Sequence, residues 1–277
     1  MMQGKTVVAT GATSGIGAAA VEALARQGAR IVFVARDPVR AEAMRARLEA
    51  AAPGLGHRAF FADLSLMAQT RRVGAEIAAA APRIDVLVNN AGALFNQRRI
   101  TPEGLEQTFA LNHMSYFVLT GVLLENIKAA KGRIVSTSSR AHRGAKLDFD
   151  DLPCTRLSRG FGVYGRSKLC NILFTRELAL RLSGSGVTAN CLHPGLVASR
   201  FADEAGGWTA SLLKLLKRFA LSPEQGADTL VWLASAPELA GVTGGYFARR
   251  QPALLSAAAQ DDEAARRLWA ISEKLNA

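Results

Sequence analysis

The chain has 277 residues, of which 49% are hydrophobic and 21% charged. This is a globular composition, and no apolar run approaches the ~20 residues needed to cross a bilayer, so we expect no integral membrane segment. The net charge of +11 would suit nucleic acid, an anionic membrane surface or a phosphorylated cofactor. Because the basic residues form no block and no nucleic-acid module is present, we expect no nucleic acid partner.

Short β-branched runs alternate with longer amphipathic stretches rich in Ala, Leu and Arg. This alternation predicts an α/β fold, a single Rossmann-type doubly wound parallel sheet with helices on both faces. We expect one domain over residues 1–277, and ligands beyond the carboxyl ends of its strands. About seven strands are predicted: Thr6–Thr10, Arg30–Ala35, His57–Ala62, Ile84–Asn89, Arg133–Ser138, Thr188–His193 and one near Tyr246.

The first predicted strand runs into a glycine-rich segment that opens a helix. Three glycines spaced G-x-x-x-G-x-G let the backbone turn tightly and bring N–H groups and the positive helix end against a pyrophosphate. An ordinary glycine-rich turn is the alternative, but the strand before, the helix after and the second strand on schedule favour a dinucleotide site. The residues predicted to form it are Gly11, Thr13, Ser14, Gly15, Ile16 and Gly17.

The end of the second predicted strand distinguishes the two nicotinamide cofactors. An acid there would bind the adenosine ribose, whereas a guanidinium would hold a 2′-phosphate. Ala35 stands where the acid is expected and Arg36 follows it, so NADP(H) is favoured. We interpret Asp37 as a helix-capping residue before Pro38, although it could also approach the ribose.

The third and fourth predicted strands also end on the cofactor side of the sheet. Loop chemistry would explain their residues equally well, because Asp, Asn and Gly are common in turns. The positions predicted to contact the cofactor are Asp63, Leu64, Asn90, Ala91 and Gly92.

A tyrosine and a lysine, Tyr164 and Lys168, stand four residues apart in a strongly helical stretch. At this spacing both side chains share one helix face, so an ammonium can lie near a phenol while both face one ligand. The pair follows a serine-rich strand end, Ser136 to Ser139, and precedes His193-Pro194-Gly195.

With these motifs, the chain resembles the short-chain dehydrogenase/reductase family over nearly its whole length, and most of all its retinol-dehydrogenase-like group. The segments that carry the resemblance are 10–17, 89–92, 112–113, 138–142, 148–152, 164–168 with 171–174, and 193–195.

The resemblance implies a catalytic tetrad of Asn112, Ser139, Tyr164 and Lys168. Tyr164 would exchange a proton with the substrate oxygen, Ser139 would hydrogen-bond that oxygen, and Asn112 would hold a water that links Lys168 to solvent. A free tyrosine has a pKa of about 10. We expect Lys168 and the positive charge of the nicotinamide to lower it.

The resemblance also implies further cofactor contacts. Tyr164 and Lys168 would lie at the nicotinamide and its ribose, and the loop after the sixth strand would hold the carboxamide. The residues of that loop are Pro194, Gly195, Val197 and Ser199.

A substrate flap is expected around residues 200–221. Within it, apolar residues from Trp208 to Phe219 recur at helical spacing, with basic residues facing elsewhere. We interpret this helix as a lid that selects a bulky hydrophobic carbonyl compound. Ordinary core packing and a membrane-surface helix are the alternatives.

The cysteines and histidines show neither a close pair nor metal-ligand spacing, so we expect no disulfide and no metal. We expect no signal peptide and a cytoplasmic location. The predicted function is oxidoreduction of a small-molecule carbonyl or alcohol with NADP(H). The alternatives are a non-catalytic NADP(H)-sensing regulatory protein and a light-driven pigment reductase. A homo-oligomer that pairs through the helices around Asn112 and Tyr164 is also possible by resemblance.

Overall fold

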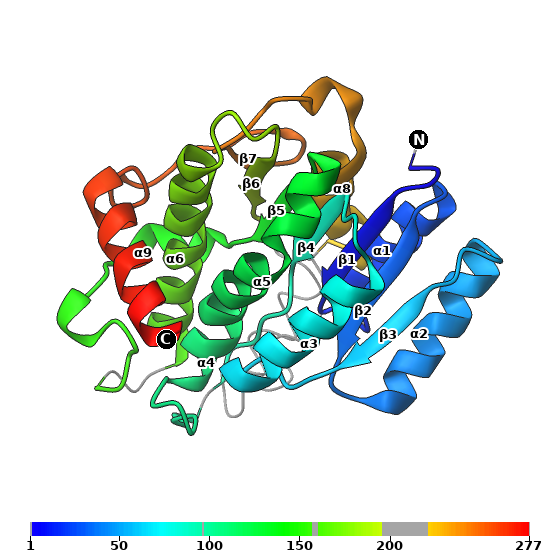
Figure 1. Cartoon of the computed structure of the whole chain (residues 1–277). Coiled ribbons are helices and arrows are strands. Elements are labelled where there is room, and N and C mark those ends of the chain that lie inside the picture. Colours follow the sequence, from blue (N-terminus) through cyan, green and yellow to red (C-terminus); the bar gives the residue numbers. More distant parts are fainter. Residues whose placement is uncertain (1, 96, 157–159, 196–220, 277) are drawn as a thin grey trace.

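The computed structural model describes residues 2–95, 97–156, 160–195 and 221–276. Its strands form one sheet of eight in the order β3-β2-β1-β4-β5-β6-β7-β8 (Figure 1). Strands β1 to β7 pair in parallel, and β8 pairs antiparallel with β7. The predicted doubly wound sheet is therefore confirmed, with one strand more than expected.

The strands are β1 (Thr6–Thr10), β2 (Arg30–Ala35), β3 (Arg58–Phe61), β4 (Val86–Asn89), β5 (Arg133–Thr137), β6 (Thr188–Leu192), β7 (Tyr246–Ala248) and β8 (Gln251–Pro252). The α-helices are α1 (Gly15–Arg26), α2 (Pro38–Ala51), α3 (Met67–Ala80), α4 (Gln107–Phe109), α5 (Ser115–Ala130), α6 (Gly160–Arg181), α8 (Pro223–Ser235) and α9 (Asp262–Asn276). A π-helical turn (Ala110–Met114) joins α4 to α5.

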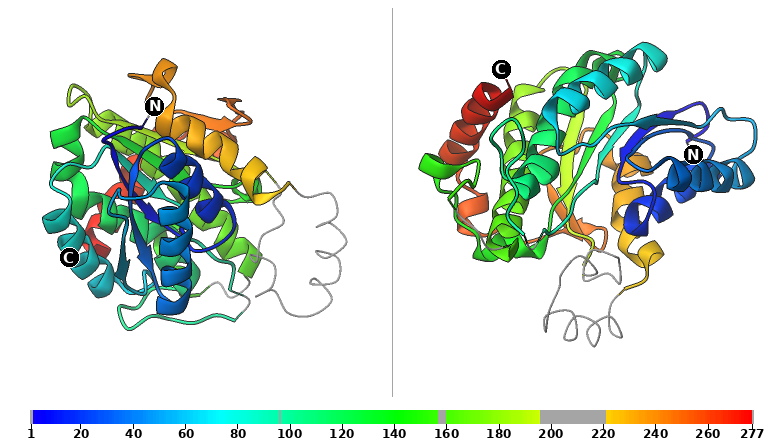
Figure 2. Two further views of the ribbon diagram at one scale, coloured as in Figure 1. Left: turned by 90° about the vertical axis from the view of Figure 1, so that its right-hand side faces the viewer. Right: turned by 90° about the horizontal axis from the view of Figure 1, so that it is seen from below.

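Two apolar cores lie on the two faces of the sheet, because successive side chains of a strand point to opposite faces. In β2, Ile31 and Phe33 belong to the core shared with α1, α2 and α8. Val32 and Val34 belong to the core shared with α3, α5 and α6. Figure 2 shows the resulting two helical layers on opposite sides of the sheet.

The C-terminal helix α9 packs along α6 and also contacts α5. Trp269 of α9 stacks on Phe174 of α6, with ring centroids 5.8 Å apart and an interplanar angle of 12°. The same ring meets Phe117 of α5 edge-on at 5.0 Å, and the Arg181 guanidinium lies 4.4 Å from its centroid. Apolar and cationic contacts therefore hold α9 on the two helices that carry much of the candidate site.

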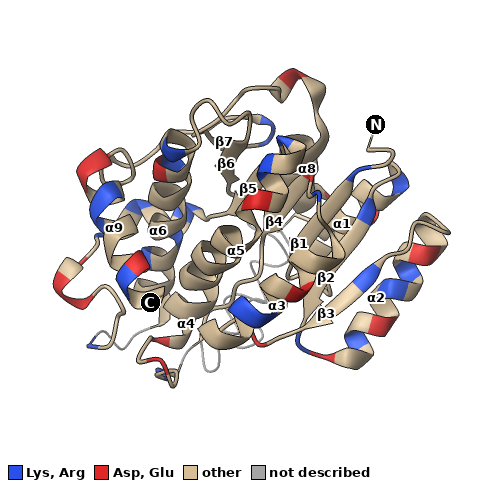
Figure 3. Cartoon of the chain, viewed as in Figure 1, with Lys and Arg blue, Asp and Glu red and all other residues tan. Residues whose placement is uncertain are grey.

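Charged residues of both signs are spread over the helices and loops, as Figure 3 shows for one view. Among the described residues, no helix combines the length and the apolar character that crossing a membrane requires.

Candidate active site

A cavity of about 300 Å³ opens beyond the carboxyl ends of β1 and β4, where the strand order reverses. Ligands of doubly wound sheets bind at such a reversal. Its wall contains seven of the residues predicted to bind the cofactor: Gly11, Thr13, Arg36, Asp63, Leu64, Ala91 and Gly92.

The β1–α1 turn has a backbone that only small residues permit. Gly11 has φ +66°, and a Cβ there would lie 2.9 Å from backbone atoms of Ala91. A Cβ on Gly17 would overlap the carbonyl of Gly11. Ser14 stands at the N-cap of α1, but its side chain makes no capping hydrogen bond. The N–H groups of the first helical turn are thus left for an anionic ligand.

The β1 and β4 ends are joined by hydrogen bonds that sequence reasoning missed. The Thr10 hydroxyl oxygen accepts from the backbone N–H groups of Asn90 and Ala91 at 2.9 and 3.0 Å. The Thr137 hydroxyl, at the end of β5, donates to Asn90 Oδ1 at 3.1 Å. These bonds fix the cavity floor. The only sequence signal was that Thr10 ends a predicted strand and Thr137 is the last residue but one of another.

At the far end of the cavity, Ala35, Arg36, Asp37 and Arg40 line the wall. The Asp37 carboxylate accepts from the N–H groups of Val39 and Arg40 at 2.9 and 3.1 Å, and so caps α2. The interpretation of Asp37 as a capping residue is confirmed. Arg40 also forms an ion pair with Asp37, at 3.6 Å. Arg36, next to an alanine in the acid's place, is suited to a phosphate.

The π-helical turn places Asn112 in a closed set of hydrogen bonds. Asn112 Oδ1 accepts from the N–H of Ala93 at 2.9 Å, and its Nδ2 donates to the Ala93 carbonyl and to Ser167 Oγ, both at 3.0 Å. Asn171 Nδ2 in turn donates to the Asn112 carbonyl at 2.9 Å. Asn112 is fully buried, so its amide is fixed rather than adaptable.

Lys168 and Tyr164 share one face of α6, as their spacing predicts. Lys168 Nζ lies 5.7 Å from the ring centroid of Tyr164 and equally far from that of Tyr116. The amine donates to the Thr137 carbonyl at 3.0 Å. The Tyr116 hydroxyl donates to the Ala91 carbonyl at 2.9 Å. Sequence reasoning missed Tyr116, whose only signal is its position four residues after Asn112.

The two adjacent serines at the end of β5 have different roles. The Ser138 hydroxyl donates to the Lys168 carbonyl at 2.7 Å and thereby joins β5 to α6. The Ser139 hydroxyl accepts from the N–H of Ala141 at 3.2 Å and hydrogen-bonds the Tyr164 side chain. The geometry therefore brings Ser139, not Ser138, to the phenol.

The protonation equilibria differ from the expectation. Burial raises the pKa of Tyr164 to about 12, although the hydrogen bond from Ser139 acts in the opposite direction. Burial also lowers the pKa of Lys168 to about 7. The expected acidic phenol is thus not a property of the chain's own groups. The cost of burying charge outweighs the attraction between phenolate and ammonium.

Of the remaining predicted cofactor contacts, the structure describes Pro194 and Gly195 but not Val197 or Ser199. Pro194 and Gly195 follow β6, and the Gly195 N–H donates to Nδ1 of His193 at 3.2 Å. Val197, Ser199 and the expected flap around 200–221, except its last residue, lie outside the described residues. Among the residues described, no three His, Cys, Asp or Glu side chains are grouped as metal ligands would be.

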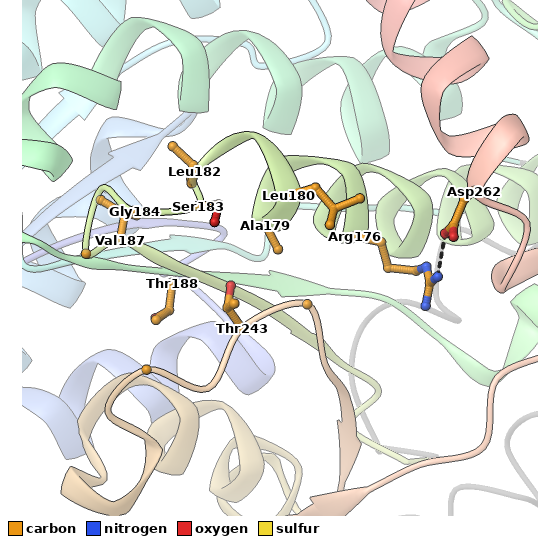
Figure 4. A pocket seen from close by; sticks show the side chains of 13 residues that line it. Arg176, Ala179, Leu180, Leu182, Ser183, Gly184, Val187, Thr188, Thr243 and Asp262 are labelled. Atoms are coloured by element: carbon orange, nitrogen blue, oxygen red, sulfur yellow. Dashed lines mark hydrogen bonds and ion pairs between the residues drawn. The ribbon is translucent and has the colours of Figure 1, made fainter.

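A second cavity, of about 680 Å³, lies at the opposite edge of the sheet, before β6 and β7 begin. It contains none of the predicted site residues. Its two charged side chains, Arg176 and Asp262, face each other in Figure 4. They form an ion pair with a distance of 2.6 Å. We therefore place the candidate site in the first cavity.

The chain belongs to the short-chain dehydrogenase family, whose family model matches residues 5–209. Within it, the chain falls in the retinol-dehydrogenase-like group: human retinol dehydrogenase 13 is 40% identical over 98% of this chain and 84% of its own length. A proposed daunorubicin C-13 ketoreductase from Streptomyces sp. (strain C5) is also 40% identical, over 98% of this chain and 92% of its own.

Solved structures agree with this assignment. An uncharacterised protein from Mycobacterium paratuberculosis has a TM-score of 0.80 and 31% identity, covering 99% of this chain and 94% of its own. The RhlG/NADP complex of Pseudomonas aeruginosa has a TM-score of 0.70 and 26% identity, covering 90% of this chain and 95% of its own. The protein is therefore an oxidoreductase of a family that uses nicotinamide dinucleotides.

Proposed function

We propose that the protein is an NADP(H)-dependent reductase and dehydrogenase that interconverts a carbonyl compound and its alcohol. The observation that carries this proposal is the meeting of Ser139, Tyr164 and Lys168 beside a cavity whose far end bears Arg36 and Arg40. A hydroxyl, a phenol and an amine at one point are the groups needed to bind a carbonyl oxygen and to exchange a proton with it.

Three features of the chain make the cavity suitable for a dinucleotide. Gly11 and Gly17 leave no room for side chains where a pyrophosphate would approach, and the first turn of α1 has no side-chain cap. At the other end, Gly92 lies beside Lys168: a Cβ on it would be 3.3 Å from Nζ. When bound, a nicotinamide dinucleotide supplies the hydride and, in its oxidised form, a positive charge.

Tyr164 is assigned as the proton donor during reduction and the acceptor during oxidation. Ser139 orients the phenol through their hydrogen bond and offers a second donor to the substrate oxygen. Lys168, with a pKa of about 7, can take up or release a proton near neutrality. Asn112 holds the adjoining backbone at Ala93 and so fixes the wall beside the amine.

Arg36 is assigned to the 2′-phosphate, and Arg40 lines the same wall. A guanidinium pair favours a phosphate over a free hydroxyl, because charge-assisted hydrogen bonds are stronger than neutral ones. The similarity to the RhlG/NADP complex gives this assignment further support.

The proposed substrate is a bulky carbonyl compound with a large apolar part. Retinol, an alcohol, and daunorubicin, a ketone, appear in the names of two relatives, and both have a large apolar part. The flap predicted around 200–221 would cover it, and Val197 and Ser199 remain predicted cofactor contacts.

The test compares NADPH with NADH on a panel of aromatic, steroidal and retinoid aldehydes and ketones. Wild type should turn over bulky members with NADPH, and Tyr164→Phe should lower kcat by about 100-fold or more while NADPH still binds. Arg36→Ala should raise the KM for NADPH by about tenfold and change that for NADH little.

Equal activity of wild type and Tyr164→Phe would refute the assignment. Nucleotide binding without turnover of any substrate would favour the regulatory protein, and turnover only under illumination would favour the pigment reductase.

A further inference from the structure

Three arginines lie close enough to His193 for their charges to act on it, and we call them the arginine cluster: Arg140, Arg143 and Arg249. Arg140 follows Ser139 directly, and Arg143 lies in the same 3-10 helix, Arg140–Gly144. Arg249 lies in the turn between β7 and β8. All three side chains are exposed to solvent.

A row of buried or half-buried rings connects the two parts of this cluster to Ser139. His142 Nδ1 lies 2.7 Å from the Ser139 carbonyl oxygen. The His142 ring meets the Tyr246 ring edge-on at 5.2 Å, and Tyr246 lies 5.7 Å from the ring of His193. The 3-10 helix, β7 and the end of β6 are therefore packed together next to Ser139, and Arg249 directly follows β7.

The charge of the cluster is not neutralised by any acid among the described residues. Neither Arg140, Arg143 nor Arg249 forms an ion pair there, and Arg143 donates only to the Leu254 carbonyl, at 3.3 Å. Burial and then the charges of these arginines lower the pKa of His193 to about 4. The charges of Arg140, Arg143 and Tyr164 also act on the hydroxyl of Tyr246, whose pKa burial raises. The cluster and the proposed proton donor therefore have a neighbour in common.

The turn that carries Arg249 has an unfavourable backbone. Arg249 and Arg250 have φ of 51° and 57°, the left-handed region in which two-residue hairpin turns prefer Asn and Gly. Contacts explain Arg250: its N–H donates to Thr229 Oγ1 at 3.2 Å, and its guanidinium pairs with Asp228. No comparable contact within the described chain explains Arg249. Strain of this kind is concentrated at functional sites.

We propose that the arginine cluster binds a carboxylate of the substrate, so that the enzyme prefers carbonyl compounds that carry a carboxylate away from the reacting carbon. This inference rests on the proposed function, because it places the substrate beside Ser139 and Tyr164. Guanidinium forks match the two oxygens of a carboxylate, and exposed arginines need not be desolvated in the free enzyme. An anionic membrane surface would need no connection to Ser139, and the packing from Ser139 to His193 therefore favours a substrate.

The test uses two probes of similar shape, 4-formylbenzoate and its neutral methyl ester, with NADPH. For each, kcat and KM are measured in wild type, Arg140→Gln and Arg249→Gln. The ratio of kcat/KM for the carboxylate to that for the ester should fall about tenfold in each variant, mainly through the KM of the carboxylate. In wild type the ratio should also fall when salt is raised, because exposed charges are screened.

Arg250→Gln is the matched control. It removes a guanidinium from the same turn, but one whose charge Asp228 already neutralises. Its ratio should stay within about twofold of wild type, as expected for an exposed pair. An unchanged ratio in Arg140→Gln and Arg249→Gln would overturn the proposal. So would an unchanged ratio combined with weaker binding to phosphatidylserine vesicles, which would assign the cluster to a membrane. If wild type reduced neither probe nor any other carbonyl compound, the proposed function itself would fail.

Discussion

Replacing Lys168 by methionine should make the protein more stable at acidic pH, although it removes a residue assigned to the reaction. Lys168 is 3% exposed, and burial lowers its pKa from an ordinary 10.5 to about 7. At 1.36 kcal/mol for each pKa unit, the buried ammonium costs about 5 kcal/mol of folding free energy. Methionine fills a similar volume without a charge.

Two favourable interactions of the Lys168 ammonium, which methionine cannot make, reduce this gain. Lys168 Nζ donates one hydrogen bond to the Thr137 carbonyl, worth about 1 kcal/mol. That carbonyl keeps a partner, because Asn171 Nδ2 also donates to it, at 3.2 Å. The approach to two aromatic rings contributes about another 1 kcal/mol. We therefore expect Lys168→Met to raise the free energy of unfolding by about 2–3 kcal/mol at pH 6, as the balance of these contributions.

The pH dependence of the free energy of unfolding is a second test of whether Lys168→Met stabilises the protein. Between pH 7 and 10.5 the unfolded lysine holds a proton that the folded one has released, so wild-type stability rises with pH over this interval. By pH 10 the cost of burial falls below about 1 kcal/mol, and the variant should no longer have an advantage. Urea unfolding at pH 6 and pH 10 measures both values. Lys274→Met, at an exposed lysine of α9, is the control and should change stability by less than about 0.5 kcal/mol. A destabilised Lys168→Met at pH 6, or a gain equal at both pH values, would refute the reasoning.

Three further substitutions test other parts of the structure. Gly17→Ala should abolish NADPH binding in a fluorescence titration and cost about 1–3 kcal/mol, because its Cβ would overlap the Gly11 carbonyl; unchanged binding would contradict the close packing of this turn. Asp37→Ala should lower the free energy of unfolding by about 1 kcal/mol through loss of the α2 cap, and urea unfolding would show no change if the cap were unimportant. Ser272→Ala removes a 3.1 Å contact to the ring of fully buried His113 and should lower thermal stability by about 1–3 kcal/mol, whereas a neutral result would mean that the ring is satisfied elsewhere.

The parts of the fold that sequence predicted are those with a repeating local pattern. In β1 and β2 the run of β-branched residues is long enough to have a clear beginning and end, and both strands were predicted with their observed bounds. Strand β8 has only two residues, Gln251–Pro252, and no period can be recognised in so short a segment. Its existence depends on the preceding turn and on pairing with β7, which are tertiary features.

The site followed the same division. The glycine turn and the pair Tyr164 and Lys168 could be recognised because their geometry depends on neighbours in sequence. Contacts between distant segments, such as that of Tyr116 with Ala91, left no local signal. The direction in which the pKa of Tyr164 shifts could not be predicted from the sequence either, because it depends on how much protein surrounds the phenol. The spacing of Tyr164 and Lys168 predicted an attraction that would lower the pKa of the phenol, but burial raises it.

Helix α9 has a consequence for contacts between molecules. It lies along α6 and contacts α5 through Trp269 and Phe117; α5 and α6 are the helices through which the family resemblance would have subunits pair. A second molecule would have to compete there with a segment tethered to the same chain, whose effective concentration is in the millimolar range. Self-association through the face of α6 that α9 covers would therefore have to displace this helix.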